Sequence, residues 1–101
     1  MKNKIYVVLP AYNEEESIGK LLKRIQYNME DSGFTNYQVI IVNDGSIDKT
    51  VDVVNECKKE MPIELLNHPV NMGLGATIRD GLYHAAKVAS DRDIIITMDA
   101  D

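Results

Sequence analysis

Two aspartates separated by a single residue, Asp99 and Asp101, close an apolar run that the sequence predicts as a strand. Alternate residues of a strand point the same way, so the two carboxylates can converge. Two carboxylates held so close together raise each other's pKa unless a cation lies between them. Oxygen ligands without a neighbouring His or Cys favour a hard cation, Mg²⁺ or Mn²⁺, which proteins usually share with substrate phosphates. A solvated acidic strand end is the alternative, because Asp-x-Asp alone is a weak motif.

Two earlier strands are predicted to end in polar turns of a similar kind. Pro10-Ala-Tyr-Asn-Glu-Glu-Glu16 follows the first apolar run, and Asn43-Asp44-Gly45-Ser46 follows the second. Ligands of open α/β sheets bind beyond the carboxyl ends of the strands, so the three turns predict one site. Asp44 comes directly after its strand, and we expect it to contact a ligand. For Ser46 and Asp48, capping of the next helix is an equal alternative.

The three glutamates at positions 14–16 indicate which part of a ligand the first turn meets. They suit the positive end of a helix dipole, with Asn13 as the N-cap and Glu16 closing a capping box. A helix start that binds phosphate offers free N–H groups and glycines instead. This turn is therefore expected to contact a neutral group, such as a base or a ribose.

The elements that must position these turns alternate between strand and helix. Strands are predicted over residues 5–9, 38–42, 63–66 and 93–98, and helices over 14–31, 49–60 and from about 71–76 to 89. The first two strands are apolar throughout, as in a parallel sheet covered by helices on both faces. Pro10 lacks the N–H that a central ladder needs, so the first strand should end there. The sequence thus predicts a single α/β domain, 1–101, with a Rossmann-like, mostly parallel sheet of about four strands in a three-layer sandwich.

Several other residues of reactive type have a simpler structural interpretation. Cys57 lies at helical spacing among apolar residues and is expected to be packed rather than nucleophilic. His68 and His84 have no companions at metal-ligand spacing and are expected to be structural or exposed. Gly73 and Gly75 allow a ligand to approach the backbone closely, and close helix–sheet packing explains them equally well.

Charge and hydropathy narrow the possible partners and the compartment. A net charge of -5 argues against a nucleic-acid partner, which requires a basic face. No apolar run approaches the ~20 residues that cross a bilayer, and the N-terminus lacks a signal-peptide pattern. A single cysteine allows no internal disulfide, so we expect a cytoplasmic protein. The chain stops at Asp101 inside a motif, which favours the first part of a longer protein.

Four motifs, in this order and spacing, resemble the nucleotide-sugar half of a family 2 glycosyltransferase with the GT-A fold. They are strand-Pro-Ala-Tyr-Asn-Glu-Glu, strand-Asn-Asp-Gly-Ser-x-Asp-x-Thr, Asn-x-Gly-x-Gly and strand-Asp-Ala-Asp. Within that family the chain looks most like the dolichol- or polyprenol-phosphate mannosyl- and glucosyltransferases. The likeness covers essentially the whole chain, and the motifs are specific only together.

The resemblance implies an inverting, metal-dependent transfer of a sugar from a nucleoside diphosphate, such as GDP or UDP. The implied acceptor is a polyprenyl or dolichyl phosphate or a cell-envelope glycan. Residues matching those that hold the base and ribose are Pro10, Tyr12, Glu14, Val42 and Asp44. Residues matching those beneath the diphosphate are Asp99, Ala100 and Asp101, with the two aspartates as ligands of Mg²⁺ or Mn²⁺.

The resemblance also limits what this stretch is expected to do by itself. The family's general base and acceptor-binding elements lie downstream of Asp101, so these 101 residues are expected to bind a donor without transferring its sugar. The whole protein would act in the cytoplasm or at the cytoplasmic face of a membrane. The last strand lacks later neighbours, and its free edge favours pairing with a second copy of the chain.

Two other kinds of protein place comparable residues at strand ends. A dinucleotide-binding oxidoreductase requires Gly-x-Gly-x-x-Gly after the first strand, where this chain has Pro-Ala-Tyr-Asn-Glu-Glu. A receiver-like signalling module requires an acidic pair after the first strand and an aspartate after the third, which here ends in Leu66-Asn67-His68-Pro69. A non-catalytic nucleotide-binding or receiver-like module is the alternative function.

Overall fold

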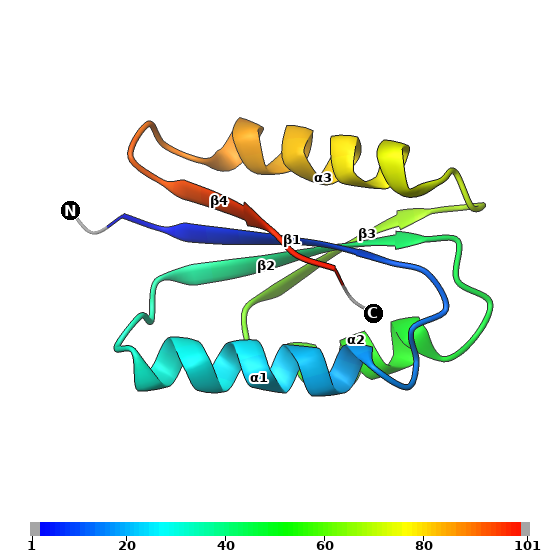
Figure 1. Cartoon of the computed structure of the whole chain (residues 1–101), viewed down its shortest axis with the longest axis horizontal. Helices are drawn as coiled ribbons and strands as arrows, with labels where there is room; N and C mark the ends of the chain where they lie inside the picture. Colours follow the sequence, from blue (N-terminus) through cyan, green and yellow to red (C-terminus); the bar gives the residue numbers. More distant parts are fainter. Residues whose placement is uncertain (1–2, 100–101) are drawn as a thin grey trace.

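The computed structural model describes residues 3–99 and shows helices on both faces of one sheet (Figure 1). The elements in chain order are β1 (Ile5–Ala11), α1 (Ile18–Asp31), β2 (Tyr37–Asp44), α2 (Thr50–Lys58), β3 (Ile63–His68), α3 (Leu74–Val88) and β4 (Ile94–Thr97). Each strand is followed by a helix until β4, as the sequence predicted.

The sheet has four strands in the order β3-β2-β1-β4, and every neighbouring pair is parallel. Helices α1 and α2 cover one face, and α3 covers the other, where it packs mainly on β1 and β2 (Figure 1). This confirms the predicted parallel α/β sandwich. All four strands point their carboxyl ends to the same edge, which is where a ligand site is expected.

Strand β1 is apolar on both faces because it supplies two separate hydrophobic clusters. Ile5, Val7 and Leu9 pack with the residues of α1 and α2, whereas Tyr6 and Val8 pack beneath α3. All five are less than a tenth exposed. Alternation of side chains along the strand therefore gives each helical layer its own part of the core.

Close packing of α3 on the sheet depends on Gly81 and not on the two glycines at the start of the helix. A Cβ atom at Gly81 would lie 2.5 Å from Cγ1 of Val8 and 3.1 Å from Cγ2 of Val42. A Cβ atom at Gly73 or Gly75 would meet nothing within 4 Å. The packing explanation offered for those two glycines is therefore wrong.

Strand β1 continues through Pro10 to Ala11, so the prediction that it ends at the proline is wrong. Pro10 lies opposite Val42 of β2, but β4 has already ended, because its last pairing is Val8 with Thr97. The carbonyl of Val8 accepts a bond from the β4 side, and Pro10, two residues later, faces that same side. The N–H that proline lacks would therefore have no ladder partner there.

The first helix begins at Ile18, four residues later than the sequence predicted, and its N-cap position is Ser17. Asn13 is not the N-cap: it adopts a left-handed backbone conformation with φ 51° in the loop before the helix. The capping box of Asn13 with Glu16 is therefore not formed. This loop is longer than predicted and carries Tyr12 and Glu14 at the carboxyl edge of the sheet.

Two further expectations concern features away from that edge. Cys57 is buried in the cluster beneath α1 and α2, and burial raises the pKa of its thiol, so it is a packed residue as predicted. None of the helices in residues 3–99 is long and apolar enough to cross a membrane.

Candidate functional site

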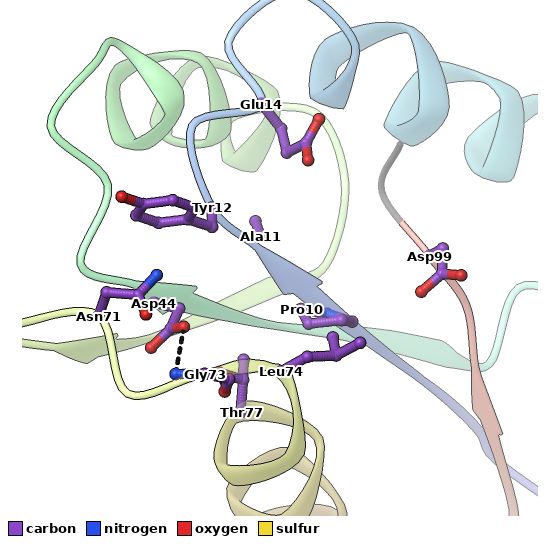
Figure 2. A pocket seen from close by; sticks show the side chains of 10 residues that line it. All are labelled: Pro10, Ala11, Tyr12, Glu14, Asp44, Asn71, Gly73, Leu74, Thr77 and Asp99. Atoms are coloured by element: carbon purple, nitrogen blue, oxygen red, sulfur yellow. Dashed lines mark hydrogen bonds between the residues drawn. The ribbon is translucent and has the colours of Figure 1, made fainter.

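A cavity of about 380 Å³ opens at the carboxyl edge of the sheet, within the range of about 300–1,000 Å³ typical of small-molecule sites (Figure 2). It is formed by the ends of β1 and β2, the segment after β4 and the start of α3. Its lining residues are Pro10, Ala11, Tyr12, Glu14, Asp44, Asn71, Gly73, Leu74, Thr77 and Asp99. The three polar turns noted in the sequence therefore meet at one pocket.

The pocket brings together most of the residues that the sequence singled out. The lining includes five of them, namely Pro10, Tyr12, Glu14, Asp44 and Asp99. Val42 is fully buried next to Gly81 and does not line the cavity, so its predicted place in the nucleoside wall remains a prediction. Ala100 and Asp101 lie outside the described residues.

The loop before α3 and the first turn of α3 supply a wall of the pocket with three residues to which the sequence had assigned no role. Asn71 of the loop and Leu74 and Thr77 of α3 line it together with Gly73. The hydroxyl of Thr77 donates to the carbonyl of Gly73 over 2.7 Å and fixes this turn of backbone. The signal for this wall was the Asn-x-Gly-x-Gly motif, whose individual residues were not assigned to the site.

Asp44 is buried, with 3% of its surface exposed, and its carboxylate holds the loop that leads into α3. Oδ1 accepts from the amide of Met72 over 2.7 Å, and Oδ2 accepts from the amide of Gly73 over 3.0 Å (Figure 2 shows the pair with Gly73). Oδ1 also lies 2.9 Å from Nδ1 of His68. Asp44 therefore joins the end of β2 to the loop before α3.

The same contacts determine the charge of the Asp44 carboxyl. Burial by itself would raise its pKa, but the hydrogen bonds from His68 and from the amides of Met72 and Gly73 outweigh burial and lower the pKa. Asp44 is therefore a carboxylate at neutral pH, although it is buried.

The side of the pocket that carries Tyr12 is held by hydrogen bonds between the loop after β1 and the loop after β2. The amide of Asn13 donates to Oγ of Ser46 over 3.0 Å, and the amide of Ile47 donates to Oδ1 of Asn13 over 2.9 Å. The amide of Glu14 donates to Oγ1 of Thr50 over 2.8 Å. These bonds connect positions more than thirty residues apart and fix the backbone that carries Tyr12.

Asp48 supports the same pair of loops. Its Oδ2 accepts from the amide of Glu15 over 3.2 Å, and its Oδ1 accepts from the amide of Thr50, the first residue of α2, over 2.9 Å. Burial acts to raise the pKa of Asp48, but the bonds from Thr50 and Glu15 lower it overall. Ser46 and Asp48 thus hold the loops together by hydrogen bonds and do not line the pocket. Neither occupies the N-cap position of α2, which is Lys49.

Carboxylates stand on two sides of the cavity. Asp99 lies across the pocket from Tyr12 and Asp44, while Glu14 stands near Tyr12 (Figure 2). One carboxylate oxygen of Glu14 accepts from the hydroxyl of Ser17 over 3.0 Å. Among residues 3–99 no group of three or more His, Cys, Asp or Glu side chains is placed to hold a metal ion. The predicted partner of Asp99 in metal binding, Asp101, lies beyond that range.

Comparison with known proteins decides the family. The sequence profile described as Glycosyl transferase family 2 matches residues 6–101, nearly the whole chain. The chain belongs to glycosyltransferase family 2. A dolichyl-phosphate β-glucosyltransferase of Trichomonas vaginalis, ALG5A, is 44% identical over 101 residues, which cover 94% of this chain and 29% of that relative. The chain thus spans less than a third of that family member's length.

Two solved structures share the fold. Residues 1–349 of S. aureus TarS in complex with UDP superpose with a TM-score of 0.80 at 24% identity, covering 97% of this chain and 27% of that one. Glucosyl-3-phosphoglycerate synthase of Mycobacterium tuberculosis, in complex with Mn²⁺, UDP and glucosyl-3-phosphoglycerate, gives a TM-score of 0.72 at 25% identity, covering 98% of this chain and 34% of that one. The sheet and its helices therefore have the GT-A fold, as the sequence predicted.

Membership of family 2 decides between the alternatives raised by the sequence. The turns after the strands lack the residues that the oxidoreductase and the receiver-like module require, and neither alternative accounts for a family match over residues 6–101.

Proposed function

We propose that this chain is the donor-binding part of an inverting glycosyltransferase that takes a sugar from a nucleoside diphosphate. The observation that supports this most directly is the convergence of Pro10, Tyr12, Glu14, Asp44 and Asp99 on one cavity. These residues come from three separate parts of the sequence and lie at or after the carboxyl ends of the neighbouring strands β2, β1 and β4. Family membership supplies the class of reaction.

The distribution of polar groups suggests how a donor lies in the pocket. Tyr12 is partly exposed and offers a ring face against which a base can stack. Glu14 and Asp44 repel phosphates and accept hydrogen bonds, so the base and ribose belong beside them. Asp99, across the pocket, is then left for the diphosphate end (Figure 2).

A divalent cation fits the diphosphate end by the chemistry of its donors. Asp99 supplies carboxylate oxygens on the pocket wall, and the sequence places a second carboxylate at Asp101. Mg²⁺ and Mn²⁺ prefer such oxygen ligands and are commonly completed by phosphates of a substrate. The ion would supply charge neutralisation for the leaving nucleoside diphosphate. Asp99 and Asp101 are the residues proposed to hold it.

The acceptor and the location of the complete protein extend this proposal. We assign the acceptor to the polyprenyl or dolichyl phosphates or to a cell-envelope glycan, by analogy with the dolichyl-phosphate glucosyltransferase to which the chain is similar. The reaction would take place in the cytoplasm or at the cytoplasmic face of a membrane. The general base would be supplied by residues downstream of Asp101, so the 101 residues bind a donor and do not transfer its sugar.

Binding of GDP and UDP to the 101-residue chain, measured by isothermal titration with and without Mn²⁺, tests the proposed function. We expect one of the two nucleotides to bind, at least about tenfold more tightly with Mn²⁺, because the ion offsets repulsion between the diphosphate and the aspartates. The Asp101→Ala variant should lose the effect of Mn²⁺. Asp91→Ala, an exposed carboxylate in the turn before β4, should not. Absence of nucleotide binding by the unaltered chain contradicts the proposal.

A second copy of the chain is proposed to pair with the free edge of β4. This strand is at the end of the sheet, and one face of it is apolar yet exposed: Ile94, Ile96 and Met98 are 49%, 40% and 37% exposed. An uncovered apolar edge strand is a template for pairing between chains. Sedimentation should show association that increases with concentration and is weakened by Ile96→Lys but not by Tyr27→Lys, an exposed residue on α1. A monomer at high concentration contradicts the pairing.

A further inference from the structure

A histidine at the end of β3, His68, connects Asp44 of the pocket to helix α3. The side chain of His68 is 10% exposed and lies between two carboxylates. Its Nδ1 is 2.9 Å from Oδ1 of Asp44, and its Nε2 is 2.8 Å from Oδ2 of Asp80 on α3. A carboxylate only accepts hydrogen bonds, so both contacts form together only when both ring nitrogens carry a proton.

Two carboxylates face the ring and favour its protonated form. Asp44 faces it from β2 and Asp80 from α3, and Arg79 pairs with Asp80 over 3.2 Å between Nε and Oδ1. The hydrogen bond with Asp44 raises the pKa of His68 above its ordinary value, against the opposing effect of burial, and the bond with Asp80 raises it further. The folded site therefore favours the cationic form of the ring more than water does.

The position of the His68 ring determines which carboxylate oxygen of Asp44 can still accept a hydrogen bond. Oδ1 of Asp44 receives the amide of Met72 as well as His68, so both of its lone pairs are used. Oδ2 receives the amide of Gly73 and has acceptor capacity left. With both lone pairs of Oδ1 occupied, Oδ2 is the oxygen of Asp44 that can still accept a hydrogen bond from a ligand.

We propose that His68 and Asp80 are positioning residues of the nucleoside site, holding the Asp44 carboxylate in the orientation that a donor nucleotide requires. The inference rests on the proposed function and adds two residues that do not line the pocket. Asp80 acts through His68, and His68 acts through Asp44. Neither residue is proposed to touch the nucleotide.

The contacts of His68 predict how nucleotide affinity changes with pH. A group whose pKa is raised in the folded state stabilises that state below its ordinary pKa and loses the contribution as the pH rises through the raised value. Above that value the ring keeps one N–H, and a lone pair then faces either Asp44 or Asp80. Nucleotide affinity should therefore fall on the alkaline side, by about tenfold for the loss of one charge-assisted hydrogen bond at the site.

The test compares nucleotide affinity between about pH 6 and pH 9 in variants of two histidine–carboxylate pairs. His68→Asn keeps a donor toward Asp44 but has no charge and no contact with Asp80. The matched control is His84→Asn, because His84 also binds a carboxylate of the neighbouring strand, Glu64, over 2.9 Å, and lines no part of the cavity. GDP and UDP with Mn²⁺ are the probes, and comparing variants at each pH cancels titration of the nucleotide itself.

We expect the unaltered chain and His84→Asn to lose affinity as the pH rises, and His68→Asn to bind about tenfold more weakly at about pH 6 without a further alkaline loss. Asp80→Asn keeps the imidazole in place and should move the alkaline loss to lower pH, which a purely structural contact would not do. If His68→Asn fails to fold, the shift expected in Asp80→Asn still tests the positioning role.

The outcomes separate this inference from the proposed function. Nucleotide binding that is the same in His68→Asn and the unaltered chain across the pH range overturns the positioning role and leaves the donor site standing. An alkaline loss whose midpoint is unmoved in Asp80→Asn also overturns it. A chain that binds neither nucleotide at any pH overturns both proposals.

Discussion

Replacing Gly45 with alanine is expected to destabilise the chain by about 2–4 kcal/mol and to weaken nucleotide binding. Gly45 has φ 73°, in the left-handed region that a side chain disfavours. A Cβ atom there would also lie 2.5 Å from the amide nitrogen of Asn71 and 2.5 Å from the carbonyl carbon of Val70. Both are backbone atoms of the loop before α3, so this loop must move and carry Asn71 off the pocket wall.

Urea unfolding and nucleotide titration of Gly45→Ala measure the two effects separately. Gly33→Ala is the matched control, because Gly33 has φ 78° but a Cβ atom there would meet nothing within 4 Å. We expect the control to lose about 1 kcal/mol from the backbone conformation alone and to keep its nucleotide affinity. Equal losses of stability in the two variants would show that the contact with the loop has no energetic weight.

The architecture of the chain was predictable because its strongest signals are local. The apolar runs of β1 and β2 are fully buried, and each carries side chains for both helical layers, as continuous hydrophobicity indicates. The alternation of strand and helix then leaves few arrangements other than a parallel sheet. The order β3-β2-β1-β4 was not predictable in this way, since nothing local states which strands become neighbours.

Errors at the element ends have tertiary causes. Asn13 has the local features of an N-cap, but its amide and side chain bond to Ser46 and Ile47, which are more than thirty residues away. Pro10 is accepted within a strand because the neighbouring β4 is short. In both cases the deciding partner belongs to another turn of the fold, so propensity at the position itself favoured the wrong interpretation.

The site was predictable in part for the same reason. Residues directly after apolar runs, such as Tyr12 and Asp44, follow from the rule about carboxyl ends of strands. The contact of Asp44 with His68 follows instead from the pairing of β2 with β3, which sets these two residues opposite each other. Asp80 joins them only because α3 folds back over the sheet. The sequence alone therefore indicated a histidine without companions, where the structure shows one between two carboxylates.

Replacing Asp44 with asparagine is expected to cost on the order of 3 kcal/mol of folding free energy and to abolish measurable nucleotide binding. Three donors converge on this carboxylate, from His68, Met72 and Gly73. An amide keeps one acceptor oxygen and turns an NH₂ group toward the remaining donors, so at least one buried donor is left unpaired. A domain of this size is expected to have about 5–15 kcal/mol of stability, so the variant should still fold.

Unfolding of Asp44→Asn as a function of pH gives a signature beyond the loss of stability. In the unaltered chain Asp44, whose pKa is lowered, stabilises the fold above its ordinary pKa, and His68, whose pKa is raised, stabilises it until the pH passes the raised value. The variant should lose stability most between these limits and show a weaker alkaline decline, because the hydrogen bond with Asp44 is the main cause of the raised pKa of His68. Asp93→Asn is the matched control: its carboxylate also accepts two backbone amides, from Lys4 and Ser90, but at the opposite end of the sheet. Asp93→Asn should lose less stability than Asp44→Asn and keep nucleotide binding. If Asp44→Asn behaved like this control, the buried carboxylate would hold neither the loop nor the ligand.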